Sequence, residues 1–140
     1  MTHCAGFRAA AVASSADLRS IGIDAELHLP LPEEIHGIVL LPEEQQLVQD
    51  LAASHPGIAW DRLIFSAKES VFKAWFPLTR QWLDFLECRI SIDIPTQRFQ
   101  ASIRDEQAMA AKHGLSVMNG AWKAGGPSGQ GLLGTCITVP

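Results

Sequence analysis

The segment Trp60–Phe76, WDRLIFSAKESVFKAWF, constrains the fold of this 140-residue chain more than any other. Its apolar residues recur at i, i+3, i+4 and i+7, which is the pattern of a helix. These residues are Trp60, Leu63, Ile64, Ala67, Val71, Ala74 and Trp75. Three phenylalanines flank this stripe, so the helix is apolar over most of its circumference and is expected to be buried. The pattern predicts a long buried helix that ends near Pro77.

A narrow polar stripe runs along the opposite side of this helix, if each residue turns it by roughly 100°. The stripe consists of Arg62, Ser66, Glu69 and Lys73. One interpretation is a surface helix with a Glu69–Lys73 ion pair, worth a few tenths of a kcal/mol. The other interpretation is that the stripe faces an internal cleft or a partner, because a helix that is apolar over most of its circumference exposes little of its surface to water.

The rest of the chain predicts strands and two short helices. Phe7–Ala13 is a run of mainly Ala and Val, which predicts a buried strand. Proline and first-turn carboxylates predict short helices over Glu33–Leu40 and Pro42–Ala53. Other segments alternate apolar and polar residues, as strands do. They are Leu18–Glu26, Cys88–Ile94, Gln97–Ile103, Leu115–Lys123 and Leu132–Val139. The order β-β-α-α-α-β-β-β-β indicates a single α+β domain over residues 1–140.

Charge and composition exclude several classes of protein. A net charge of −4 argues against a nucleic-acid binder, which normally carries a basic stripe. No apolar run reaches the roughly 18 residues that span a bilayer. The five histidines show no zinc-binding spacing. Three widely spaced cysteines indicate reduced thiols, so a cytoplasmic location is expected.

Asp24 and Glu26 stand two residues apart at the end of a predicted strand. Side chains at i and i+2 of a strand point to the same face, so the two carboxylates project together. Two negative charges at so short a distance repel each other, and this repulsion is costly unless a positive charge lies between them. A divalent cation would supply that charge, and oxygen ligands alone favour Mg²⁺ over zinc. The alternative is a solvated strand end with no ligand.

Two motifs together give the chain a family resemblance. The first is Gly22–Glu26, GIDAE, and the second, about forty residues later, is Phe65–Lys73, FSAKESVFK. This pair resembles the phosphopantetheinyl transferases, which carry (V/I)-G-(V/I)-D-x-E and (F/W)-(S/C/T)-x-K-E-(A/S)-x-x-K. The opening Thr2-His3-Cys4 is similar to the Sfp and enterobactin-synthase type. The fold that this resemblance implies is an antiparallel sheet packed against a long helix.

The resemblance implies a Mg²⁺-dependent enzyme, a holo-acyl-carrier-protein synthase. It would move the 4′-phosphopantetheine arm of coenzyme A onto a serine of a carrier protein, releasing adenosine 3′,5′-bisphosphate. The partner would be an acyl, polyketide or peptidyl carrier protein. Phosphoryl transfer requires neutralisation of the pyrophosphate charge and positioning of the hydroxyl nucleophile.

The resemblance also implies roles for particular residues. Asp24, Glu26 and Glu69 match the magnesium-binding acids of the family. Glu69 is expected to accept the serine proton, directly or through a water. Lys68 and Lys73 match the lysines that reach the coenzyme A phosphates, with Lys73 on the Glu69 face. His3 matches a histidine at the phosphate end of coenzyme A.

The resemblance covers only the second of the two similar halves of the Sfp-type enzymes. The chain is therefore expected to be either a truncated part of a longer enzyme or one that replaces the missing half by self-association. Two functions stay open: a competent transferase, and a non-catalytic remnant that binds coenzyme A or a carrier protein. A homodimer is expected to form through the face of the missing half, beside Glu69, because Phe65, Phe72 and Phe76 would stay partly exposed.

Overall fold

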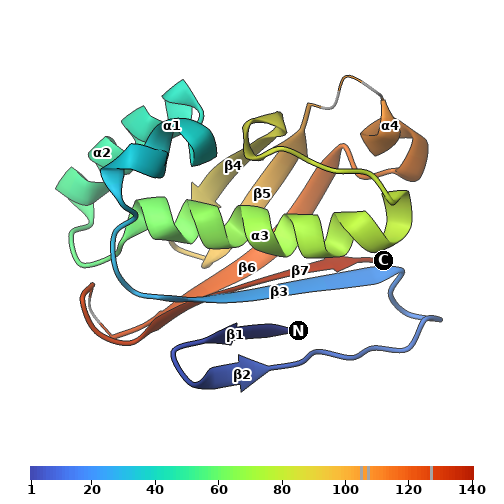
Figure 1. Ribbon diagram of the computed structural model, residues 1–140, viewed down its shortest axis with the longest axis horizontal. Helices are drawn as coiled ribbons and strands as arrows, with labels where there is room; N and C mark the ends of the chain where they lie inside the picture. Colours follow the sequence, from blue (N-terminus) through green and yellow to red (C-terminus); the bar gives the residue numbers. More distant parts are fainter. Residues whose placement is uncertain (105, 107, 127) are drawn as a thin grey trace.

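In the computed structural model, the described residues are 1–104, 106, 108–126 and 128–140. Its main layer is a five-stranded antiparallel sheet in the order β3-β7-β6-β5-β4. The strands are β3 (Ser20–Leu27), β4 (Cys88–Asp93), β5 (Arg98–Ile103), β6 (Val117–Gly125) and β7 (Leu132–Val139). One face of this sheet is crossed by the long helix α3 (Trp60–Thr79), as Figure 1 shows. The predicted α+β class, with an antiparallel sheet against a long helix, is confirmed.

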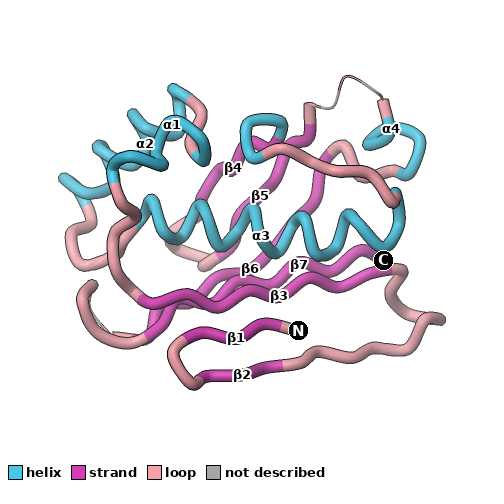
Figure 2. The backbone as a smooth tube through the Cα atoms, in the orientation of Figure 1, coloured by secondary structure: helices cyan, strands magenta, loops and turns pink. Residues whose placement is uncertain are grey.

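The remaining α-helices are shorter than α3 and lie towards its two ends (Figure 2). The two predicted before α3 are present: a 3₁₀ turn, Glu33–Ile35, leads into α1 (His36–Val39), and α2 spans Pro42–Ser54. Sequence patterns missed two others, because each is only about one turn long. They are a 3₁₀ turn at Phe85–Glu87 and α4 (Met109–His113). Among the described residues, no helix is both long enough and apolar enough to cross a membrane.

Helix α3 forms the centre of the hydrophobic core. Trp60 and Trp75 are both 1% exposed, and Ile64 and Val71 are fully buried. The helix continues past Pro77 to Thr79, so the predicted end near Pro77 was slightly too early. A proline removes one backbone donor, but the last turn keeps other bonds. They are Thr79 Oγ1 to Trp75 O at 3.2 Å, Trp75 Nε1 to Gln81 O at 2.9 Å, and Arg80 N to Phe76 O at 2.9 Å.

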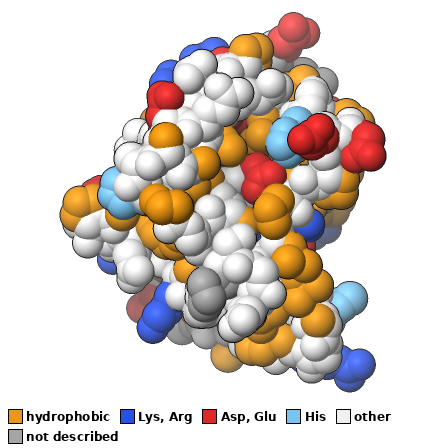
Figure 3. Space-filling model, turned by 90° about the vertical axis from the view of Figure 1, so that its left-hand side faces the viewer, with side chains coloured by type: hydrophobic (Ala, Val, Ile, Leu, Met, Phe, Trp, Pro, Cys, Tyr) orange, Lys and Arg blue, Asp and Glu red, His pale blue; other side chains and the backbone are white. Residues whose placement is uncertain are grey.

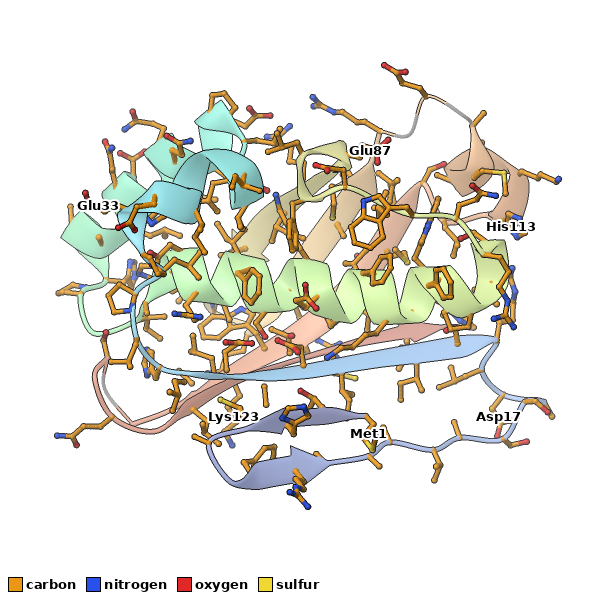
Figure 4. The ribbon with its side chains drawn as sticks, in the orientation of Figure 1. Met1, Asp17, Glu33, Glu87, His113 and Lys123 are labelled. Carbon is orange, nitrogen blue, oxygen red and sulfur yellow. The ribbon has the colours of Figure 1, made fainter. Side chains whose placement is uncertain are left out.

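A separate two-stranded hairpin precedes the main sheet. Strands β1 (Thr2–Cys4) and β2 (Phe7–Ala9) are joined by Ala5 and Gly6, which both have positive φ, as in a tight two-residue turn. The predicted buried strand Phe7–Ala13 is therefore wrong. Only its first three residues form a strand, and most of its side chains are exposed. The reason is that β2 pairs only with β1, while the following residues form a loop that runs outside β3 towards Asp17 (Figure 4).

Strand β3 and helix α3 approach each other most closely at Gly22. A Cβ atom at this position would overlap the Ser70 carbonyl oxygen and would lie 2.9 Å from the Ala74 backbone nitrogen. The two helix residues that face Gly22 are themselves small and buried. The glycine is thus required by close backbone packing, and this packing places the residues after Gly22 beside the polar stripe of α3.

We expect Gly22→Ala to lower the free energy of unfolding by about 1–3 kcal/mol or more, because the methyl group has no space. Thermal or urea unfolding measures the effect. Gly37→Ala in α1 is the matched control, since a Cβ there meets no atom within 4 Å. That substitution is expected to be neutral or slightly stabilising, as Gly→Ala in a helix usually is. Equal stability of the Gly22→Ala variant and the wild type would contradict the packing argument.

Candidate functional site

Asp24 lies at the centre of the site, where β3 faces α3. Its side chain is 5% exposed. The Lys73 ammonium donates to Asp24 Oδ1 at 2.7 Å and to the Ile23 carbonyl oxygen at 3.2 Å. The Thr2 hydroxyl donates to the same Oδ1 at 3.3 Å. The other oxygen, Oδ2, is buried and has no hydrogen-bond partner among the described residues. A buried carboxylate oxygen left bare in this way is costly.

Glu26 lies on the same face of β3 and is held by Arg62 from α3. Arg62 Nη1 donates to Glu26 Oε2 at 3.2 Å, while its other nitrogens donate to the carbonyl oxygens of Leu29 and Pro30. Burial raises the pKa of the Glu26 carboxyl group, and the negative charge of Asp24 raises it further, against the opposing effect of Arg62. The two carboxylates of the first motif therefore repel each other, as the sequence predicted.

Glu69 projects from α3 towards the same region and is half-buried. No hydrogen bond or ion pair of its carboxylate exists within the described part of the chain. Burial raises the pKa of Glu69, the charge of Asp24 adds to that rise, and Lys73 opposes it. Because Lys73 pairs with Asp24 instead of Glu69, the surface ion pair between Glu69 and Lys73 is not formed. The polar stripe of α3 faces the main sheet of the same chain, where Arg62 and Lys73 pair with the acids of β3. A cleft or a partner along this stripe, as the second interpretation had it, stays a prediction.

The raised pKa values mean that ionised Glu26 and Glu69 destabilise the fold. Above their ordinary pKa of 4.5, the unfolded chain loses these protons before the folded chain does. Folding stability therefore falls as the pH rises from 4.5 to the raised pKa of each carboxyl group, and this loss of stability persists at neutral pH. A positive charge placed among the three acids would remove part of this cost.

The residues present fit a hard divalent cation in the nature of their donors. All are carboxylate oxygens, which suit Mg²⁺, and Asp24 Oδ2 has no hydrogen-bond partner in the part of the chain that the structure describes. The described residues nevertheless contain no group of three or more His, Cys, Asp or Glu side chains arranged to hold a metal ion. Lys73 and Arg62 are paired with two of the three predicted ligands. The acids thus share one region without forming an assembled set of ligands.

Lys68 lies away from these acids, on the other side of α3. Its ammonium donates to Glu44 Oε2 at 2.6 Å, to the Val39 carbonyl at 2.7 Å and to the Phe85 carbonyl at 2.9 Å. Both side chains of this ion pair are 1% exposed. All three ammonium protons are therefore used inside the protein, and none points to a phosphate. The structure favours a structural role for Lys68 over the predicted contact with coenzyme A.

Glu44 completes this buried network. Its second oxygen accepts from the Ile90 backbone nitrogen of β4 at 2.7 Å, and Oε2 also accepts from the Leu41 nitrogen at the start of α2 at 2.9 Å. The pair thereby joins α3, α2 and the edge strand of the sheet. A buried ion pair with every donor and acceptor used holds these elements in one arrangement.

His3 lies on the exposed side of β1, pointing away from the buried Thr2. Its cross-strand partner in the hairpin is Arg8. No hydrogen bond joins His3 to the acids in the described structure. From the sequence, Thr2 was expected only as part of the opening motif and Arg62 only as part of the polar stripe. Neither residue had a predicted role in the site.

A narrow cavity of about 170 Å³ opens beside Glu69. It is lined mainly by apolar side chains of α3 and of the segment that follows it: Phe72, Trp82, Leu83, Phe85 and Cys88, together with Lys68, Glu69 and Asp84. The rings of Phe72 and Trp82 contact each other at a tilt of 58°, with centroids 5.0 Å apart. Residues 82–85 show no periodicity, which is why the sequence pattern gave no sign of this wall.

The chain shows clear similarity to known proteins. The family model of the 4′-phosphopantetheinyl transferase superfamily matches residues 20–124. The 4′-phosphopantetheinyl transferase Svp of Streptomyces mobaraensis is 47% identical over 139 residues, covering 99% of this chain and 55% of Svp. The 4′-phosphopantetheinyl transferase PptT of Mycobacterium tuberculosis is 36% identical, covering 99% of this chain and 60% of PptT. The 4′-phosphopantetheinyl transferase Npt of Nocardia iowensis is 49% identical over 94 residues, which are 67% of this chain and 41% of Npt. The chain therefore spans between 41% and 60% of the length of these relatives.

We expect Lys68→Met to destabilise the protein by about 3–5 kcal/mol, because it leaves the buried Glu44 carboxylate without its cation. Denaturant unfolding measures the loss. Lys112→Met, at an exposed position of α4, is the control and should change stability by less than about 0.5 kcal/mol. If Lys68→Met kept wild-type stability but lost affinity for coenzyme A, the ligand role expected from the motif would hold instead.

Proposed function

The chain belongs to the 4′-phosphopantetheinyl transferase superfamily, and on that premise we propose that it transfers 4′-phosphopantetheine from coenzyme A to a carrier protein. The acceptor is the serine hydroxyl of an apo acyl, polyketide or peptidyl carrier protein, and the other product is adenosine 3′,5′-bisphosphate. The observation that carries the proposal is the grouping of Asp24, Glu69 and Lys73 where β3 meets α3. The proposal includes a cytoplasmic location, in keeping with the free cysteines Cys4, Cys88 and Cys136.

Glu69 is the proposed proton acceptor. In the transfer, the serine oxygen bonds to the β-phosphorus of coenzyme A, the bond from that phosphorus to the bridging oxygen breaks, and the serine proton must leave. The Glu69 carboxylate has no partner among the described residues, and its pKa is raised by burial and by Asp24. A raised pKa brings a carboxylate closer to the value that suits a general base at neutral pH.

Asp24, Glu26 and Glu69 are the proposed ligands of Mg²⁺. When bound, the ion would neutralise negative charge on the pyrophosphate of coenzyme A. The bare Asp24 Oδ2 and the mutual repulsion of the acids support this assignment. Lys73, whose side chain is 30% exposed, is the proposed cation for a phosphate oxygen. His3 on the hairpin is the proposed contact for the phosphate end of coenzyme A, whereas Lys68 has a structural role in this proposal, because its ammonium is buried in the ion pair with Glu44.

The cavity beside Glu69 is the proposed place for the pantetheine arm. That arm is a slender, unbranched chain, and the cavity is narrow and mainly apolar. An arm lying along the Phe72 and Trp82 rings, which contact each other, would place the phosphate at the Glu69 end of the cavity. Apolar walls with a few polar groups at one end are typical of small-molecule sites.

The proposal concerns a chain that spans 55% and 60% of two of its relatives. We propose that residues 1–140 act as one half of the two-half enzyme. Binding of coenzyme A or of a carrier protein without transfer is the alternative. Figure 3 shows one side of the molecule, where Lys and Arg side chains lie apart at the rim without forming a continuous patch. Basic contacts to an acidic carrier protein are not concentrated on that side.

We expect Asp24→Asn and Glu69→Gln each to reduce transfer by at least about 100-fold, since one lowers the affinity for the cation and the other removes the base. Mass spectrometry of an apo carrier protein incubated with coenzyme A and Mg²⁺ measures the transfer. Glu34→Gln, at an exposed position without a side-chain partner among the described residues, is the control. Wild-type rates for Asp24→Asn at saturating Mg²⁺ would contradict the site. Coenzyme A binding without transfer by the wild-type chain would favour the alternative.

We also propose self-association through the surface beside Glu69. Phe76 is 40% exposed and Trp82 is 72% exposed, so this flank of α3 stays partly uncovered, as the sequence predicted. A second copy placed there would complete the outer wall of the cavity. Sedimentation of the purified chain is expected to give a dimer, and Trp82→Asp is expected to give a monomer. Ile38→Asp, at an apolar position of α1 that is 61% exposed, should leave the dimer intact. A wild-type monomer at tens of micromolar would refute this interface.

A further inference from the structure

The Thr2 hydroxyl is the polar link between the β1–β2 hairpin and the acid site. Thr2 is 6% exposed, although its neighbours in the hairpin are largely exposed. Its Oγ1 atom contacts two groups of β3: the Ala25 backbone nitrogen at 3.1 Å and Asp24 Oδ1 at 3.3 Å. The hairpin forms a sheet of its own, without ladder pairing to β3. Among the described residues, the hydrogen bonds that join the hairpin to β3 are those of this hydroxyl.

The two contacts fix the direction of the hydroxyl proton. The Ala25 N–H is a donor, so it must occupy a lone pair of Thr2 Oγ1. A carboxylate can only accept, so the Thr2 proton must point to Asp24 Oδ1. The hydroxyl thus has a single orientation in this site. Lys73, at 2.7 Å, carries a positive charge and neutralises the carboxylate, whereas the uncharged Thr2 hydroxyl, at 3.3 Å, can only orient it.

Both donors converge on one oxygen of Asp24. Thr2 approaches Oδ1 from the hairpin and Lys73 approaches it from α3. The second oxygen, Oδ2, is buried and bonds to no group of residues 1–104, 106, 108–126 and 128–140. Rotation of the carboxylate about its last bond would break both contacts at Oδ1. The arrangement therefore distinguishes the two oxygens and holds Oδ2 in one position.

We propose that Thr2 is a positioning residue, which holds the Asp24 carboxylate so that Oδ2 is presented to a divalent cation. The proposal rests on the proposed function, because it takes Asp24 as a ligand of the ion. It goes beyond that function by assigning a role to the hairpin. The hairpin strand that carries His3 on its exposed side also sets the direction of the carboxylate on its buried side. Outer-shell hydrogen bonds of this kind commonly change metal affinity by 10- to 100-fold.

The test is the affinity of the full chain for Mn²⁺, measured by electron paramagnetic resonance of the free ion, without substrates. Thr2→Val keeps the shape of the side chain and removes the hydroxyl, and it is expected to raise the dissociation constant about tenfold or more. Thr2→Ser restores the hydroxyl and should stay within about threefold of the wild type. Thr138→Val, the same substitution at an exposed position of β7, is the control and should bind Mn²⁺ as the wild type does.

Three outcomes overturn the proposal: wild-type affinity in Thr2→Val, failure of Thr2→Ser to recover it, and absence of Mn²⁺ binding by the wild-type chain. Thermal unfolding of every variant separates a lost orientation from a lost fold, and Thr2→Ala replaces Thr2→Val if the latter does not fold. The transfer assay is run separately. A chain that binds Mn²⁺ through Thr2-oriented Asp24 but transfers nothing would support the present inference and refute the proposed function.

Discussion

The close approach of β3 and α3 at Gly22 is the constraint on which the site depends. With no side chain between them, the strand and the helix lie near enough for Lys73 to bond Asp24 and the Ile23 carbonyl directly. The same packing brings Arg62 to Glu26, one helical face carrying both cations. A spacer of even one methyl group would separate the acids of the strand from the cations of the helix. The chemistry of the site is therefore a consequence of backbone packing.

The two lysines of the second motif have different surroundings because they point to different sides of α3. Lys68 and Lys73 are five residues apart, which places them about 140° apart around the helix. Lys68 is buried in the core, where it bonds Glu44 and the carbonyl oxygens of Val39 and Phe85, whereas Lys73 lies at the boundary between core and solvent. A buried pair with every proton used is costly to break, whereas a partly exposed lysine can exchange its partner. Lys68 thus fixes α3 in the core, whereas Lys73 is able to change its partner.

Much of this was readable from the sequence because it follows periodicity. The 3.6-residue spacing identified α3 and its polar stripe, and the alternation of residues identified the five strands of the main sheet. The environment of Lys68 could not be read, because Glu44 and Phe85 come from segments far away in the chain. The hairpin was misjudged for a related reason: an apolar run such as Phe7–Ala13 predicts burial only if something covers it. No sequence pattern predicted the role of Thr2, since the role of a hydroxyl group depends on the groups that it contacts.

The site consists of two parts that differ in how firmly they are held in the fold. The acids and lysines belong to the main sheet and its core helix, but the hairpin is a separate sheet attached through a mainly exposed connection of ten residues, 10–19. Elements with few buried contacts open locally at a lower free energy than the core does. On warming, the hairpin should leave Asp24 before the sheet and α3 melt. Loss of the organised site would then precede global unfolding, and the useful temperature range of the protein would be set by this small attachment, not by its core.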